Sequence, residues 1–223
     1  MLPRYEAQLN DLQDMISSLL NTTQEASAIT LEAYQRRDNS LFTDAISKLK
    51  NIQSDANSID NEIIKTFALF GPEAQELRTL VAYLKMTNEI VRIGEGVKKY
   101  ARRMKEHTES ECDLSPLNAT IIQLHKSTLT ALQLIDQCYA NIDECDIEDF
   151  YRKVMVEESK NDDLFAILEK EILTQIIEES ELAAEYVRVL GTLRKLERSC
   201  DRSVNIANLM LYAKQGGQMH IYS

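Results

Sequence analysis

Apolar residues recur every three or four positions along most of the chain, which is the spacing of one face of an α-helix. The first run contains Leu9, Leu12, Ile16, Leu19 and Leu20. Runs of this kind predict six long helices, at residues 3–37, 41–69, 72–106, 115–140, 147–178 and 180–214. The chain has only 6 Gly and 3 Pro, too few to separate the many short strands of a sandwich or barrel. The pattern therefore predicts an all-α protein.

Turn-forming residues fall between most of these helices. Asp38-Asn39-Ser40 supplies a turn and an N-cap, and Gly71-Pro72 is typical of one helix ending and the next beginning. Ser115-Pro116 provides another helix start, whereas Glu178-Glu179-Ser180 is a weaker break. The predicted boundaries rest on these residues.

The six helices form two sets of three, offset by about 106 residues. At that offset Arg92 aligns with Arg198, and Glu95 aligns with Asp201. Such an internal repeat indicates two copies of one structural unit. We therefore expect two tandem, pseudo-symmetric three-helix bundles.

The two predicted bundles comprise residues 1–107 and 114–215, joined by a polar linker. The helix at 72–106 carries two apolar stripes, so it is expected to have neighbours on both sides.

The formal net charge is −11, which repels a phosphate backbone and argues against nucleic-acid binding. The largest basic cluster consists of Lys98, Lys99, Arg102, Arg103 and Lys105. On a helix these residues spread over an exposed arc, which favours a solvated face over an anion site.

No secretory signal and no apolar stretch long enough for a membrane span is evident, so membrane insertion is not expected. The four cysteines, Cys112, Cys138, Cys145 and Cys200, show no CxxC spacing. In a helical chain of this kind they are interpreted as free thiols, as in a reducing compartment. We therefore expect a cytoplasmic protein.

Catalytic motifs are missing from the sequence. None of His107, His125 and His220 follows a glutamate by three residues, so the Glu-x-x-His pairs of di-iron carboxylate enzymes are absent. No phosphate-binding glycine loop, nucleophile elbow or Cys/His zinc spacing appears either. These absences favour a binding or regulatory protein over an enzyme.

The strongest candidate for site chemistry is the pair Glu197 and Asp201. Because they are four residues apart on a predicted helix, their side chains share one face, beside an apolar stripe. Two adjacent carboxylates repel each other unless a cation, an arginine or water offsets them, and such pairs are ligands for divalent metals or iron. The alternative is a salt-bridged helix flank, in which Arg194 and Arg198 neutralise the two acids.

The residues around this pair resemble a known family. The chain contains the run Leu196-Glu197-Arg198-x-x-Asp201-x-x-x-Asn205-Ile206-Ala207, which resembles the second signature of the PhoU proteins, regulators of bacterial phosphate uptake. Residues 72–85 resemble the run leading into the first signature, and residues 88–95 lie where that signature falls.

The resemblance implies clusters of iron, zinc or another divalent metal on the acidic motifs. Carried over by position, the expected ligands are Glu197 and Asp201 in the second half, and Glu76 and Glu95, each in place of an aspartate, in the first.

Two departures from the family pattern affect these ligand sets. Val91 replaces a family glutamate in the first half, where Glu89 partly substitutes, and Ser199-Cys200 replaces Ile-Gly in the second. Further candidates that could complete a site are Asp55, Asp60, Asp162 and Asp163, although solvent exposure is the simpler interpretation of each.

The resemblance also implies a function. It predicts a non-enzymatic regulator of phosphate uptake and of the phosphate-starvation response, contacting the ATPase of the phosphate-import ABC transporter and a phosphate-sensing histidine kinase. A homodimer is expected, since helical bundles often pair through apolar faces. The alternatives are an accessory or chaperone-like protein for another phosphate permease, and a carboxylate-bridged metalloenzyme.

Overall fold

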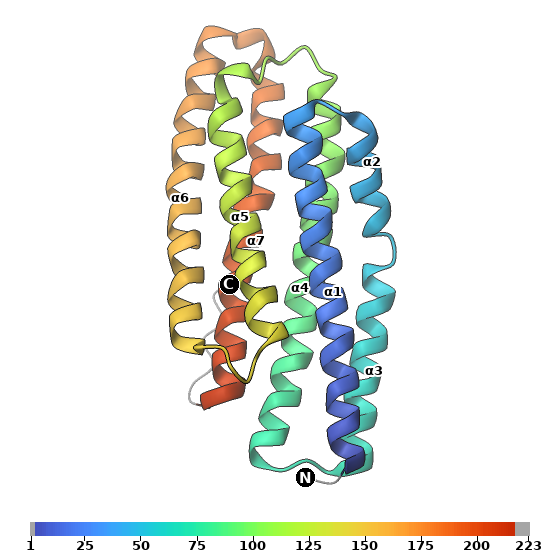
Figure 1. Ribbon diagram of the computed structural model, residues 1–223. Helices are drawn as coiled ribbons and strands as arrows, with labels where there is room; N and C mark the ends of the chain where they lie inside the picture. The colour runs from blue at the N-terminus through green and yellow to red at the C-terminus, as the bar shows by residue number, and fades with distance from the viewer. Residues whose placement is uncertain (1–2, 217–223) are drawn as a thin grey trace.

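The computed structural model describes residues 3–216 and contains only helices within that range (Figure 1). The all-α prediction is confirmed; of the predicted features, His220 lies outside the described residues. The elements are α1 (Pro3–Arg36), α2 (Asn39–Lys48), α3 (Ile52–Phe70), α4 (Ala74–Thr108), the 3₁₀ turn η1 (Ser115–Leu117), α5 (Asn118–Ala140), α6 (Ile147–Glu178), the 3₁₀ turn η2 (Ser180–Leu182) and α7 (Ala183–Gln215).

One predicted helix is two helices in the structure. The expected helix at 41–69 breaks between α2 and α3, where the N–H of Lys50 donates to the carbonyl of Ser47 at 3.1 Å. Leu49 and Ile52, on either side of the break, are both buried, so the apolar spacing continues through it. The prediction was wrong here because periodicity does not register a break that keeps both flanking side chains in the core.

The predicted turns are otherwise present. Asp38 caps α2 by accepting a hydrogen bond from the N–H of Ser40 at 2.8 Å. Gly71 ends α3 in the left-handed region, at φ 52°, a conformation that glycine adopts without the strain of a Cβ.

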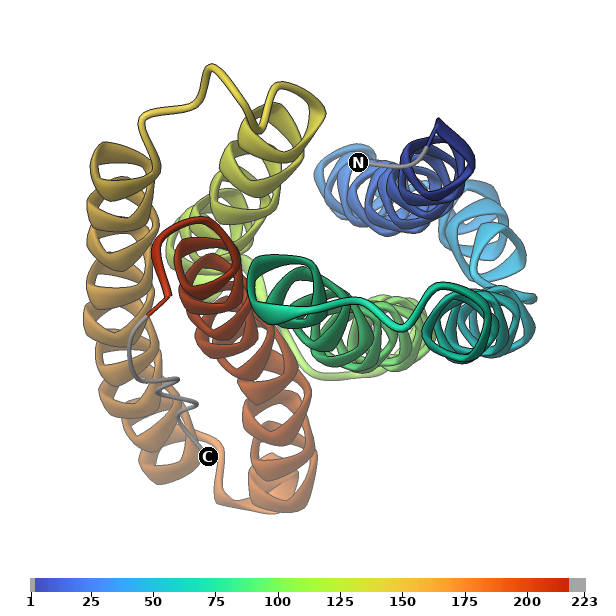
Figure 2. The same cartoon turned by 90° about the horizontal axis from the view of Figure 1, so that it is seen from below.

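The two halves lie side by side and share their interior (Figures 1 and 2). Helix α4 packs against α1, α2 and α3 of its own half and against α7 of the other, as its two apolar stripes predict, and α1 contacts α5. Each of the two apolar core clusters combines side chains from both halves. None of the described helices is long and apolar enough to cross a membrane.

The cysteine prediction is wrong for one pair. Cys138, near the end of α5, and Cys145, just before α6, form a disulfide with their Cα atoms 5.4 Å apart. The short loop between the two helices returns the chain and brings the two residues together, which spacing alone did not indicate. Cys112 and Cys200 are free and buried. The cysteines therefore no longer argue for a reducing compartment.

Buried polar side chains join α5 to α1 on one side and to α6 on the other. His125 is fully buried, its Nε2 is 3.1 Å from Ser27 Oγ, and its Nδ1 has no hydrogen-bond partner among the described residues. The amide of Asn161 donates to the carbonyl of Leu124 at 3.0 Å and to Ser127 Oγ at 2.6 Å. Burial lowers the pKa of His125 to about 3, so the imidazole is neutral at physiological pH.

Two polar contacts join α4 to α7. Glu89, only 6% exposed, accepts a hydrogen bond from the guanidinium of Arg202 at 2.8 Å. His107 Nδ1 lies 2.8 Å from Glu185 Oε1. The α4–α7 seam, defined as the contact between these two helices, therefore combines apolar packing with charge pairing.

Protonation of His125 should make the fold less stable in acid. Between about pH 6.5 and 3 the unfolded state binds a proton at this residue that the folded state excludes, so stability falls as pH falls through this window. Urea unfolding at pH 7 and pH 5 should show that the wild type loses about 2 kcal/mol more than His125→Leu. Parallel losses in the two proteins would contradict a neutral buried histidine.

Neutralising Glu89 should destabilise the seam. Glu89→Gln preserves the shape of the side chain but removes the charge that Arg202 contacts, at an expected cost of about 1–3 kcal/mol in the free energy of unfolding. The matched control is Glu32→Gln, which breaks an exposed pair with Arg36 and should cost less than about 0.5 kcal/mol. Equal effects in chemical denaturation would show that the buried pair contributes no more than a surface pair.

Candidate metal centre

Three carboxylates from two helices converge on the second half of the protein. Glu158 and Asp162 lie one turn apart on α6, and Asp201 projects from α7 beside them. One oxygen from each of the three lies within 4.8 Å of the others. The contact between α6 and α7 therefore places three anionic oxygens in one small volume.

Glu197 adds a fourth carboxylate, one turn before Asp201 on α7. Its Oε2 atom is buried and has no hydrogen-bond partner in the described part of the chain. Burial raises the pKa of Glu197, and the nearby charge of Asp201 raises it further. We refer to Glu158, Asp162, Glu197 and Asp201 together as the acidic cluster.

The cluster is short of positive charge. Burial raises the pKa of Glu158, of Asp162 and of Asp201, and neighbouring carboxylates add to each shift. Arg198 and Arg202 oppose the shift in Asp201, but neither forms an ion pair with a member of the cluster, and Arg202 contacts Glu89 instead. Mutual repulsion is therefore only partly offset by the protein's own cations.

The salt-bridged alternative for this helix flank is not what the structure contains. Arg194 pairs with Glu169 on α6 at 3.0 Å, and its guanidinium lies 5.0 Å from the ring centroid of Phe165. It influences the pKa of Glu197 only at longer range. The orphaned oxygen of Glu197 and the all-carboxylate donor set fit a hard divalent cation or iron.

The metal ligands predicted in the first half do not form a cluster in the described structure. Glu89 pairs with Arg202 across the seam, Glu95 pairs with Lys98 at 3.3 Å, and Glu76 lies in the first turn of α4. Val91, where the repeat places a counterpart of Glu197, is buried and supplies no ligand. Within residues 3–216, the acidic cluster supplies the one group of three close metal-ligating side chains.

The additional aspartates have separate surroundings. Asp162 belongs to the acidic cluster, and the neighbouring charge of Asp163 helps to raise its pKa. Asp60 on α3 has a buried Oδ1 with no hydrogen-bond partner, and burial raises its pKa. Asp55 lies in the first turn of α3.

Sequence reasoning missed Glu158. The available signal was its spacing, because Glu158 and Asp162 repeat the one-turn separation of Glu197 and Asp201.

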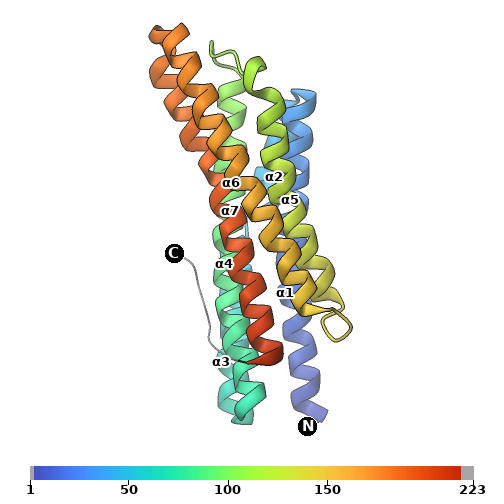
Figure 3. The same cartoon turned by 90° about the vertical axis from the view of Figure 1, so that its left-hand side faces the viewer.

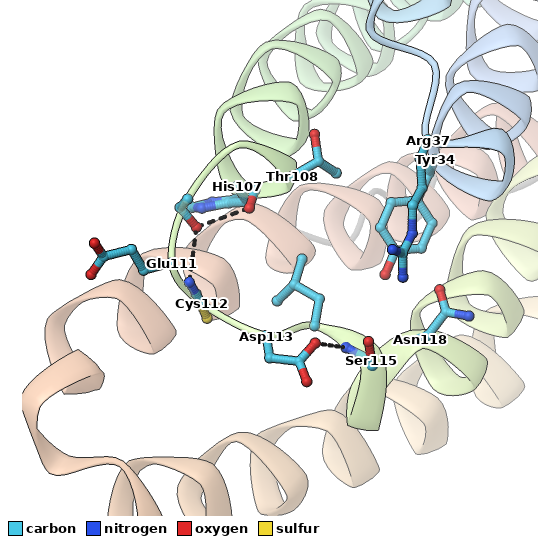
Figure 4. A pocket seen from close by; sticks show the side chains of 11 residues that line it. Tyr34, Arg37, His107, Thr108, Glu111, Cys112, Asp113, Ser115 and Asn118 are labelled. Carbon is cyan, nitrogen blue, oxygen red and sulfur yellow. Dashed lines mark hydrogen bonds between the residues drawn. The ribbon is translucent and has the colours of Figure 1, made fainter.

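A separate pocket of about 250 Å³ lies at the linker between the halves (Figure 4). Two of its polar side chains already have partners: Asp113 accepts a hydrogen bond from the N–H of Ser115 at 2.9 Å, and His107 contacts Glu185. The hydrogen bonds from Ser115 lower the pKa of Asp113. This pocket contributes no side chain to the acidic cluster.

Comparison with known proteins matches both halves of the chain to one family. A family model described as the PhoU domain matches residues 6–104 and 121–210, one match in each half. The chain is 23% identical over 213 residues to the phosphate-specific transport system accessory protein PhoU of Serratia marcescens, covering 96% of this chain and 85% of the relative. It is 26% identical over 217 residues to the PhoU homolog of Xylella fastidiosa, covering 96% and 88%.

Solved structures share the fold. The crystal structure of PhoU from Pseudomonas aeruginosa superposes with a TM-score of 0.87 at 22% identity, covering 96% of this chain and 100% of that one. The phosphate transport system regulatory protein PhoU from Streptococcus pneumoniae gives a TM-score of 0.69 at 18% identity, covering 96% and 98%. Because the family model matches both halves and the helical fold is shared, the chain belongs to the PhoU domain family.

Proposed function

We propose that this protein is a non-enzymatic regulator of phosphate uptake and of the phosphate-starvation response. The observation that carries the proposal is the match of one PhoU domain model to both halves of the chain. Relatives that align over nearly the whole chain are named accessory proteins of the phosphate-specific transport system. The long exposed helix faces offer area for protein contacts, which is what a regulator of this kind needs.

The proposed partners are the ATPase of the phosphate-import ABC transporter and a phosphate-sensing histidine kinase. Contact with the ATPase would restrain import, and contact with the kinase would restrain the starvation response. Pairing of two copies is also part of the proposal. Exposed apolar side chains supply area for such contacts: Ile64, Leu69, Leu77, Val156, Ile167, Leu173, Ile177 and Val187.

A divalent metal at the acidic cluster is the second part of the proposal. Glu197 and Asp201 of α7, with Glu158 and Asp162 of α6, would hold the ion. The bound cation would supply the positive charge that offsets repulsion among these carboxylates, and would thereby fix α6 against α7. Iron and zinc are the metals that we propose for the site.

Removing two ligands should remove the metal. Elemental analysis of the wild type after gel filtration should find iron or zinc, and the isosteric variant Glu197→Gln/Asp201→Asn should retain little of it. The matched control, Glu76→Gln/Glu95→Gln, changes the charge equally on α4 and should keep the metal content of the wild type. Equal metal content in all three proteins would exclude the acidic cluster as the site.

Metal-free protein provides a second measurement. In a chelator at neutral pH, Glu197→Gln/Asp201→Asn should unfold at a higher temperature than the wild type, because it removes repulsion among neighbouring half-buried carboxylates. A lower unfolding temperature in chelator would instead show that the two charges support the fold by themselves.

Capture of partners tests the regulatory proposal directly. The full chain, tagged and expressed in its own host, should recover the transporter ATPase and the sensor kinase from lysates prepared with a mild detergent. An unrelated helical protein with the same tag provides the control. Recovery of a different phosphate permease would favour the alternative accessory role, and recovery of neither proposed partner would count against regulation by direct contact.

A further inference from the structure

A basic hollow of about 270 Å³ lies on the α4–α7 seam. Figures 2 and 3 show the two helices running side by side. Both contribute four residues to the lining: Arg92, Glu95, Gly96 and Lys99 from α4, and Lys195, Arg198, Ser199 and Arg202 from α7. Five of the eight side chains are cationic and one is acidic.

Few of these cations have a partner. Arg202 forms an ion pair with Glu89. Glu95, the one acidic residue in the lining, forms an ion pair with Lys98. Among the described residues, Arg92, Lys99, Lys195 and Arg198 form no side-chain hydrogen bond or ion pair, although Arg198 acts at longer range on the acidic cluster. Four side-chain cations are thus left without a bonded anion in a protein whose net charge is −11.

The cations of the hollow face one another across the seam. Lys99 of α4 lines the same hollow as Lys195 and Arg198 of α7. Like charges gathered in one small volume repel one another. An anion placed among them would relieve this repulsion.

Two of the residues that line the hollow, Gly96 and Ser199, are small. A Cβ on Gly96 would lie 3.2 Å from Ser199 Oγ, so glycine allows α4 and α7 to approach closely here. Ser199 is 2% exposed and turns its hydroxyl to the carbonyl of Lys195, at 2.7 Å. These two residues therefore take up little of the space beside the long cationic side chains that share the lining.

The repeat places two arginines in equivalent positions at this hollow. Arg92 and Arg198 occupy the same position in the two copies, one on each helix. The planar guanidinium group of arginine matches the oxygens of a phosphate group and binds them with paired hydrogen bonds. None of the described residues that line the hollow is aromatic, so none of them would stack a nucleic-acid base.

We propose that the basic hollow binds a small phosphate-bearing anion between Arg92 and Arg198, with Lys99 and Lys195 supplying further positive charge. The inference goes beyond the proposed function, because a protein can regulate a transporter through surface contacts without binding a phosphate group. Such a ligand would contact both halves at once and would stabilise their association.

Calorimetric titration with inorganic phosphate and, separately, with pyrophosphate tests the proposal. Sodium chloride holds the ionic strength constant, and EDTA is present so that no anion is held through a metal. The wild type should bind at least one of the two, and Arg92→Gln/Arg198→Gln should bind it at least tenfold more weakly. The control Lys126→Gln/Lys170→Gln makes the same charge change on exposed residues of α5 and α6, and should bind like the wild type.

The two anions distinguish the size of the ligand. Preference for inorganic phosphate indicates a single phosphate group, and preference for pyrophosphate indicates a condensed or larger phosphate compound. The acidic-cluster variant Glu197→Gln/Asp201→Asn should retain binding, which separates this site from the proposed metal centre. If this acidic-cluster variant failed to bind either anion, the proposed site between the two arginines would be overturned.

Thermal unfolding separates a ligand site from a structural role. Without phosphate at low salt, Arg92→Gln/Arg198→Gln should unfold close to the wild-type temperature, because among the described residues neither arginine side chain forms a hydrogen bond or an ion pair that the fold would lose. Unfolding clearly below the wild type would assign the arginines to the fold instead. Undiminished binding by that variant, or no binding to the wild type at anion concentrations of up to about 10 mM, would overturn the proposal.

Discussion

Close packing of α4 against α7 is the contact on which the rest of the structure depends. Each is the last helix of its half, and together they bring the two copies of the unit into one body with a shared core. Glu89 and Arg202 can pair only because the helices approach closely, as can His107 and Glu185. The acidic cluster lies on one side of α7, and the basic hollow lies along the seam itself. Helix α7 therefore contributes acidic side chains to its contact with α6 and basic side chains to its contact with α4.

The two copies have diverged in chemistry while keeping the same architecture. The second has four carboxylates where α6 meets α7, whereas the first has Val91 in the core, and its Glu89 and Glu95 form ion pairs. A buried valine contributes apolar packing and imposes no charge that must be offset. The first copy can therefore support the fold without a cation, and the second carries the unbalanced charge.

The sequence was sufficient for the features that depend on local spacing. Periodicity predicted the helices, and the offset between Arg92 and Arg198 indicated the repeat. Periodicity could not reveal the break between α2 and α3, because Leu49 and Ile52 continue the apolar pattern. Other features depend on distant residues: Glu158 joins the acidic cluster from another helix, and Lys195 joins cations that are about 100 residues earlier. A solvated face was the reasonable interpretation when the cations of α4 were considered alone.

The buried pair of His125 and Ser27 has a consequence for how the halves are aligned. These residues belong to α5 and α1, which come from different copies and otherwise meet through shape and apolar contact. Apolar surfaces tolerate sliding, whereas a one-turn displacement would separate the imidazole from the hydroxyl and leave both dehydrated, at a cost of about 1–3 kcal/mol for each group. The pair therefore favours one longitudinal alignment of α5 against α1 over alignments displaced by a turn.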